Sequence, residues 1–167
     1  MDKLLLLWSR VTEILNPIGD WVALLPLRLL LAWEFWEAGV MKLGGNNWFG
    51  GIKENFPFPF NYVPVDLSWF IATWFELLGG IGLAIGLFTR FWAISLVILS
   101  VVAIFGVHWP DDWSSLSELW KGYAISNKGF GNFKLPLLFI VMLLPLFFSG
   151  PGKASVDHIL SKKFADK

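Results

Sequence analysis

Four apolar segments, at residues 21–43, 67–88, 91–107 and 130–148, decide what this chain can fold into. A helix needs about 20 mostly apolar residues to cross a bilayer, so the third and fourth segments lie near the lower limit. Pro136 and Pro145 are compatible with a membrane helix, because neighbouring helices can satisfy the backbone groups that proline frees. We therefore expect an all-α membrane protein, in which residues 1–167 form one domain built as a bundle of four transmembrane helices.

The composition agrees with a bilayer environment and excludes several classes of protein. The chain is 56% hydrophobic and 16% charged, whereas a soluble domain is about a quarter charged. Its formal net charge of zero offers no basic field for nucleic acid, and it has no glycine-rich phosphate loop or zinc-finger spacing. It also has no cysteine, which rules out disulfide exchange, iron–sulfur ligation and thiolate metal sites by this chain itself.

Lysine and arginine are more frequent on one side of the expected bundle, which predicts its orientation. The bias places both termini in the cytoplasm and the loops 44–66 and 108–133 outside, which is the periplasm if the source is a bacterium. The cytoplasmic side would hold Lys3, Arg10, Arg90, Lys153, Lys162, Lys163 and Lys167, and the other side Lys42, Lys53, Lys121, Lys128 and Lys134.

Two further helices are expected at the membrane surface. Residues 4–15 read as an interfacial helix that ends at Asn16-Pro17, although they also fit a simple lead-in to the first span. In the second outer loop, Ser115 and Glu118 have the spacing of a capping box. The short helix that follows would carry one apolar face and lie over the end of the bundle; that face consists of Trp113, Leu116 and Trp120.

The first span contains two carboxylates, Glu34 and Glu37, and the second contains Glu76. An acidic residue at the centre of a membrane helix costs about 2.5–3.5 kcal/mol on insertion scales. Counted from the outer ends of the two spans, Glu34 and Glu76 fall at the same depth, so the three acids are expected to converge. Three carboxyl groups in a low-dielectric site should not all ionise, which suits them to proton uptake and release.

Three cations are candidate partners for these acids: Arg28, Lys42 and His108. Arg28 lies deeper than Glu34 and off its helix face, so it would have to act across helices. The competing interpretation is structural, with the acids satisfying tryptophan indoles, Arg28 and loop amides. His108 equally fits an interfacial histidine with no role in a site.

The aromatic residues beside the acids suggest a ligand. Trp33 and Trp36 could form a slot for a flat ring such as a quinone, although tryptophan also packs between helices and gathers at membrane interfaces. Met41, Met142 and His108, together with the three glutamates, are potential copper ligands, but they form no close-spaced motif. We expect no metal site in this chain and no intrinsic binding of copper.

Three stretches of the sequence resemble the DoxX family of integral membrane proteins. The first two stretches, 28-RLLLAWEFWEAGVMKL-43 and 76-ELLGGIGLAIGLFTR-90, resemble the family's first-helix and second-helix signatures and match the general family pattern at Gly39, Lys42, Glu76, Gly79, Gly80 and Arg90. The third, 149-SGPGKASVDHIL-160, resembles the family's usual tail. Within the family, the chain most resembles the HvfX branch, the membrane partners of copper-binding RiPP (bufferin) maturation systems. The motifs that carry this second resemblance are WEFWE at 33–37, NWF at 47–49, FPFPF at 56–60, ATWFE at 72–76, VHWP at 107–110 and GFGNFKLP at 129–136.

The resemblance implies a four-helix inner-membrane bundle and leaves three functions open. The first is a redox accessory that interacts with quinone, with Glu34, Glu37 and Glu76 handling protons and Trp33, Trp36, Arg28, Lys42 and His108 binding the ligand. The second is a non-enzymatic component of copper homeostasis that docks or transports a copper-binding peptide. The third is a channel for protons or small solutes, which would require an oligomer.

Overall fold

The structure is a computed structural model that describes residues 2–110, 112–124 and 131–165. Every regular element in these residues is helical, as the expected all-α class requires. The helices are α1 Asp2–Val22, α2 Leu25–Gly44, α3 Val65–Ile85, α4 Thr89–Ala103, α5 Leu116–Leu119, α6 Lys134–Ser149 and α7 Val156–Ala165. Short helical turns are η1 Phe49–Gly51, η2 Lys53–Asn55, η3 Phe60–Tyr62 and η5 Trp120–Tyr123, and η4 Ile104–His108 continues α4 as a π-helix.

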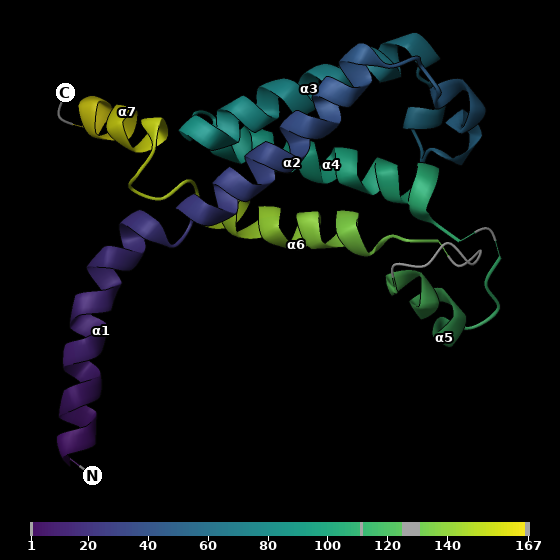
Figure 1. Ribbon diagram of the computed structural model, residues 1–167. Helices are drawn as coiled ribbons and strands as arrows, with labels where there is room; N and C mark the ends of the chain where they lie inside the picture. The colour runs from purple at the N-terminus through teal and green to yellow at the C-terminus, as the bar shows by residue number, and fades with distance from the viewer. Residues whose placement is uncertain (1, 111, 125–130, 166–167) are drawn as a thin grey trace.

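Helices α2, α3, α4 and α6 run side by side and form the body of the molecule (Figure 1). Helix α2 packs mainly on α3, α6 packs mainly on α4, and the contact of α3 with α4 joins the two pairs. The centre of this bundle is filled by aliphatic side chains that are fully buried: Leu31, Leu83, Leu96, Leu143 and Leu146.

Three stretches of the described residues are long and apolar enough to cross a membrane. They are Lys3–Gly44, Val65–Ile85 and Thr89–His108, and they make the chain a multi-pass membrane protein. The fourth expected span corresponds to α6, which is apolar but only 16 residues long. Because α6 is shorter than a typical span, the helix lengths do not confirm four crossings. The expected start of this span at residue 130 lies outside the described residues.

The predicted break at Asn16-Pro17 was wrong. Helix α1 continues through Pro17 to Val22, and the chain bends instead at residues 23–24, just before Pro26 in the first turn of α2. A proline at the start of a helix is inexpensive because the N–H that it lacks has no partner there, so Pro26 is the better break point. Figure 1 shows α1 leaving the bundle at an angle from this bend.

The segment after α6 closes one end of the bundle. Gly86 ends α3 with a left-handed φ of 70°, and a side chain there would meet Ser155 and Arg28. Asp157 then accepts hydrogen bonds from the backbone N–H groups of Phe88 (2.8 Å) and Thr89 (2.9 Å) at the start of α4. The C-terminal segment thus caps the turn between two spans.

An aromatic cluster closes the opposite end. The Phe49 ring lies 5.3 Å from that of Phe56 and 5.0 Å from that of Trp69, so the loop after α2 is packed onto α3. In the second loop the predicted capping is confirmed on one side, since the Ser115 hydroxyl accepts from the Glu118 N–H at 3.3 Å. Hydrogen bonds from Ser114 to the Glu118 carboxylate hold its pKa below the usual value.

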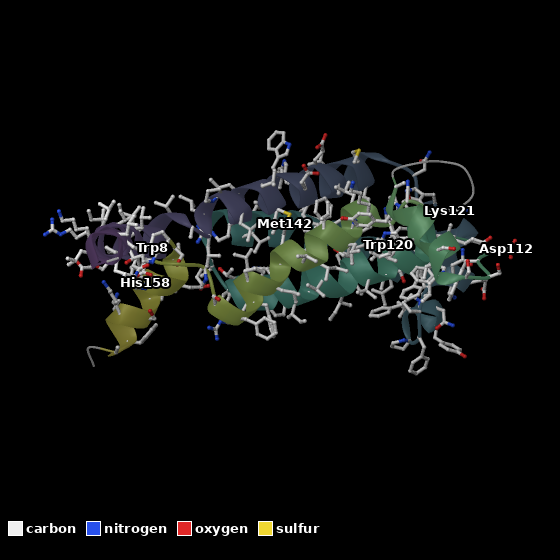
Figure 2. All side chains as sticks on the ribbon, turned by 90° about the horizontal axis from the view of Figure 1, so that it is seen from below. Trp8, Asp112, Trp120, Lys121, Met142 and His158 are labelled. Carbon is white, nitrogen blue, oxygen red and sulfur yellow. The ribbon has the colours of Figure 1, made fainter. Side chains whose placement is uncertain are left out.

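The apolar face predicted for the short helix is not buried on the bundle. Trp113, Leu116 and Trp120 are 45%, 78% and 63% exposed. Figure 2 shows Trp120 at this end of the molecule with Lys121 and Asp112, while Trp8 and His158 lie at the other end. The exposed face is therefore available to a membrane surface or to another protein.

The packing of α3 on α4 predicts the effect of one added methyl group. Gly82 lies against the Trp92 indole, and a Cβ on Gly82 would overlap the ring. We expect Gly82→Ala to lower the stability by about 1–3 kcal/mol, as overpacking does, measured by unfolding of the purified protein in detergent. Gly44→Ala is the control, because a Cβ there meets nothing within 4 Å. An equal effect of both substitutions would contradict this packing.

Candidate functional site

The intramembrane ion pair joins Lys42 of α2 to Glu76 of α3. The Lys42 Nζ donates to both carboxylate oxygens of Glu76 at 2.8 Å. The Glu76 side chain is 4% exposed and that of Lys42 is 17% exposed. Of the three cations proposed as partners, Lys42 is therefore the one that the structure places on a glutamate.

Glu76 occupies the middle of its helix. It follows Val65 by eleven residues and precedes Ile85 by nine, which puts it about 15 Å from either end at a rise of about 1.5 Å per residue. A buried ion pair costs desolvation of both charges, and removing one partner alone leaves an uncompensated charge. Glu76 and Lys42 therefore depend on each other.

Small residues bring the two helices close enough for this contact. A Cβ on Gly80 would lie 2.9 Å from the Ala32 carbonyl oxygen, and a Cβ on Gly39 would lie 2.8 Å from the Leu77 side chain. Small residues are what permits such close approach of membrane helices. Gly80 lies against Ala32 and Trp36, which are two residues before and two residues after Glu34. Gly80, and not Glu76, is therefore at the same depth as Glu34.

The sequence predicted that Glu34 and Glu76 lie at the same depth, and this prediction was wrong by about one helical turn. Counting from the span ends assumed that both helices end at the same height, whereas the glycine contacts determine the actual register. Glu34 is half-buried and Glu37 is exposed. Within the described residues, no hydrogen bond or ion pair joins either of them to Glu76 or to any other group.

The two tryptophans beside these acids face outward. Trp33 is 65% exposed and Trp36 is 41% exposed. Together with Glu34 and Glu37 they make up what we call the outer face of α2. A ring slot built from these residues would open to the surroundings of the bundle and not to its interior.

Arg28 and His108 lie away from the carboxylates and have other partners. Arg28 is 1% exposed and donates to the carbonyl oxygens of Pro151 (2.8 Å) and Ala154 (2.9 Å), so it secures the C-terminal segment. His108 Nδ1 is hydrogen-bonded to the Asn132 side-chain oxygen at the opposite end of the bundle. Neither forms an ion pair with a glutamate in the part of the chain that the structure describes.

The candidate copper ligands do not assemble. Met142 is packed against the buried core of the bundle, as its central position in Figure 2 also shows, while Met41 is 66% exposed on α2. Among the described residues, no group of three or more His, Cys, Asp or Glu side chains could hold a metal ion.

A second polar region was not predicted from the sequence. Between α1 and the C-terminal segment lies an open cleft of about 940 Å³, whose lining includes Arg90, Lys153, Asp157 and His158. We call it the tail cleft. The resemblance of residues 149–160 to a family tail was the only signal in the sequence that pointed to this region.

The ion pair predicts an asymmetry between single and double variants. We expect Lys42→Met to lower the stability by about 3–5 kcal/mol, because it leaves Glu76 buried without its counter-charge. The double variant Lys42→Met/Glu76→Met should recover most of this loss, since apolar side chains of similar size need no desolvation. Denaturation of the purified protein in detergent measures both. A double variant as unstable as Lys42→Met would show that the pair is not coupled.

Comparison with known proteins identifies related sequences. Residues 23–109 match the DoxX family. A protein of Haemophilus influenzae (strain ATCC 51907 / DSM 11121 / KW20 / Rd), described as uncharacterized, is 42% identical over 150 residues, which cover 90% of this chain and 91% of that protein. No solved structure matches the chain.

Proposed function

This chain belongs to the DoxX family, and from that premise we propose that it handles protons for a redox reaction performed with a partner enzyme in the bacterial inner membrane. The observation that carries the proposal is the pair of carboxyl groups on α2. Glu34 and Glu37 have no hydrogen bond or ion pair among the described residues, in contrast to Glu76 with its lysine.

The free-energy cost of these two acids argues for a role outside the fold. Each carboxylate near the centre of a span costs about 2.5–3.5 kcal/mol on insertion scales. Lys42 offsets that cost for Glu76, whereas nothing in the packing of α2 on α3 requires Glu34 or Glu37. Unpaired ionisable groups inside a membrane are by default candidates for proton or ligand sites.

The outer face of α2 suits a flat, lipid-soluble ring such as a quinone. Trp33 and Trp36 are exposed there, so a ligand dissolved in the bilayer reaches them without entering the bundle. A quinone held at this face by Trp33 and Trp36 would supply two-electron, two-proton redox chemistry, with its electrons from a partner oxidoreductase that has its own redox cofactor. Glu34 and Glu37 would pass the protons to and from it. Lys42 and Glu76 keep α2 in register and do not touch the ligand.

The redox partner we favour is a copper-binding RiPP maturation or copper homeostasis system. This choice is supported by the resemblance of WEFWE at 33–37 and of the outer-loop motifs to the HvfX branch. Copper itself would be carried by the peptide, because Met41, Met142 and His108 do not gather into a site in this chain.

The proposed placement in the membrane follows the lysine and arginine bias. Helix α6 forms a fourth, short span between α4 and the C-terminal segment, and both termini lie in the cytoplasm. Helix α1 rests on the cytoplasmic surface of the membrane, where its exposed leucines and tryptophans enter the interfacial region. Loops 44–66 and 108–133 then face the periplasm.

A non-enzymatic docking or transport role is the second candidate. It is favoured by the aromatic and aliphatic side chains exposed on the outer loops, which would meet a copper-binding peptide: Phe58 (81%), Tyr62 (76%), Leu116 (78%) and Trp120 (63%). Exposed aromatic side chains are common anchors in protein interfaces.

The test is the quinone content of the gently purified protein, measured by mass spectrometry of its lipid extract. We expect near-stoichiometric quinone in the native chain and at least a fivefold loss in Glu34→Leu/Glu37→Leu, because leucine can neither exchange a proton nor hydrogen-bond the ring oxygens. Glu54→Leu is the matched control, since Glu54 is exposed in the outer loop.

Two results would contradict the redox proposal. One is a native protein without quinone, and the other is equal quinone in the native and double-variant proteins. Co-purification of a copper-binding peptide with a quinone-free chain, lost on Phe58→Ala/Tyr62→Ala, would favour docking.

A further inference from the structure

The tail cleft lies at the end of the bundle opposite the packed aromatic loops. Its walls come from the C-terminal half of α1, the turn between α3 and α4, and the segment that leads into α7. Figure 2 places His158 at this end of the molecule, where α1 also lies. Since α3 ends and α4 begins here, the cleft is at the boundary of the apolar body.

The cleft is lined by two cations, Arg90 and Lys153, and by two carboxylates, Asp20 and Asp157, and Arg90 is the cation that has no ion pair among the described residues. Arg90 is exposed and makes one hydrogen bond at 3.3 Å to the Phe148 carbonyl oxygen, which leaves most of its N–H groups for a ligand. Lys153 is paired with Asp20 at 2.6 Å, with side chains that are 41% and 53% exposed, and ion pairs open to solvent contribute little stability, so a ligand can compete for Lys153. Asp157 has both oxygens engaged by the first amides of α4.

Two polar atoms in the wall lack partners. Thr89 Oγ1 and His158 Nε2 are buried without a hydrogen bond among the described residues. Buried polar atoms are nearly always hydrogen-bonded, so each unpaired one calls for an explanation. Both residues line the cleft, but both atoms are covered by protein, so an oxygen-rich group in the cleft would pair with them only after the side chains rotate.

The remainder of the lining is apolar. Leu15 of α1 faces the cleft together with Phe88 and Phe91, which are 66% and 52% exposed. A free inorganic anion would gain nothing from these side chains, whereas an acyl chain would cover them. Basic pockets at the cytoplasmic side of membrane proteins are known to hold anionic headgroups.

We propose that the tail cleft binds the phosphate of an anionic phospholipid, with Arg90 and Lys153 on the phosphate and the acyl chain along Leu15 and Phe88. Bound there, the lipid would lie between α1 and the bundle. It would supply contacts that α1 otherwise largely lacks, since α1 has few contacts with the bundle.

The experiment is native mass spectrometry of the full chain in detergent with equal amounts of phosphatidylglycerol and phosphatidylcholine. We expect the native protein to retain phosphatidylglycerol preferentially. Arg90→Gln should reduce that retention at least fivefold, because it removes the main cation. Lys163→Gln removes the same charge from α7 outside the cleft lining and should change nothing.

A second variant separates ligand loss from misfolding. Gly19 lines the cleft, and a Cβ there meets nothing within 4 Å, so Gly19→Trp can fill the space without removing a charge. We expect the same fivefold loss of phosphatidylglycerol with an unchanged melting temperature.

Inorganic phosphate, added as a competitor, distinguishes the two sources of the anion. No displacement at millimolar concentration would assign the site to a lipid, and full displacement would assign it to soluble phosphate. Equal retention of the two lipids, or no loss in Arg90→Gln and Gly19→Trp, would overturn the proposal.

Discussion

The close contact of α2 with α3 determines most of this structure. Gly39 and Gly80 remove the side chains that would hold the helices apart, and the backbones then meet in one register. That register brings the long Lys42 side chain onto Glu76 in the middle of the span. An ion pair in such a place tolerates little sliding, so the glycine contact and the charges reinforce one another.

Local patterns in the sequence were sufficient for the elements of the fold. Long apolar runs predicted α3 and the joined α4 and η4 to within a few residues, because burial in lipid depends on composition over a whole helix. The predicted break at Asn16-Pro17 was wrong because a proline does not by itself end a helix. Pro26, in the first turn of α2, occupies a position where a break costs less.

The candidate site was less predictable, because it depends on contacts between distant segments. Lys42 was among the possible partners of the acids, but only the register shows that it reaches Glu76 and that Glu34 and Glu37 remain outside. Arg28 looked like a ligand residue because it is a charge in a span. Its partners are backbone carbonyl groups near the C-terminus. Every residue has such a group, so the sequence does not indicate which of them accepts a hydrogen bond.

Arg28 also has a consequence for how the protein is made. The chain is synthesised from its N-terminus, and the Pro151 carbonyl that Arg28 binds lies 123 residues later. Until residues 151–154 have been synthesised, the guanidinium group on α2 must be hydrated or paired with other partners. The hydrogen bonds of Arg28 to the Pro151 and Ala154 carbonyl oxygens can therefore form only late, and the end of the bundle that they secure is completed after all the other helices of the bundle have been made.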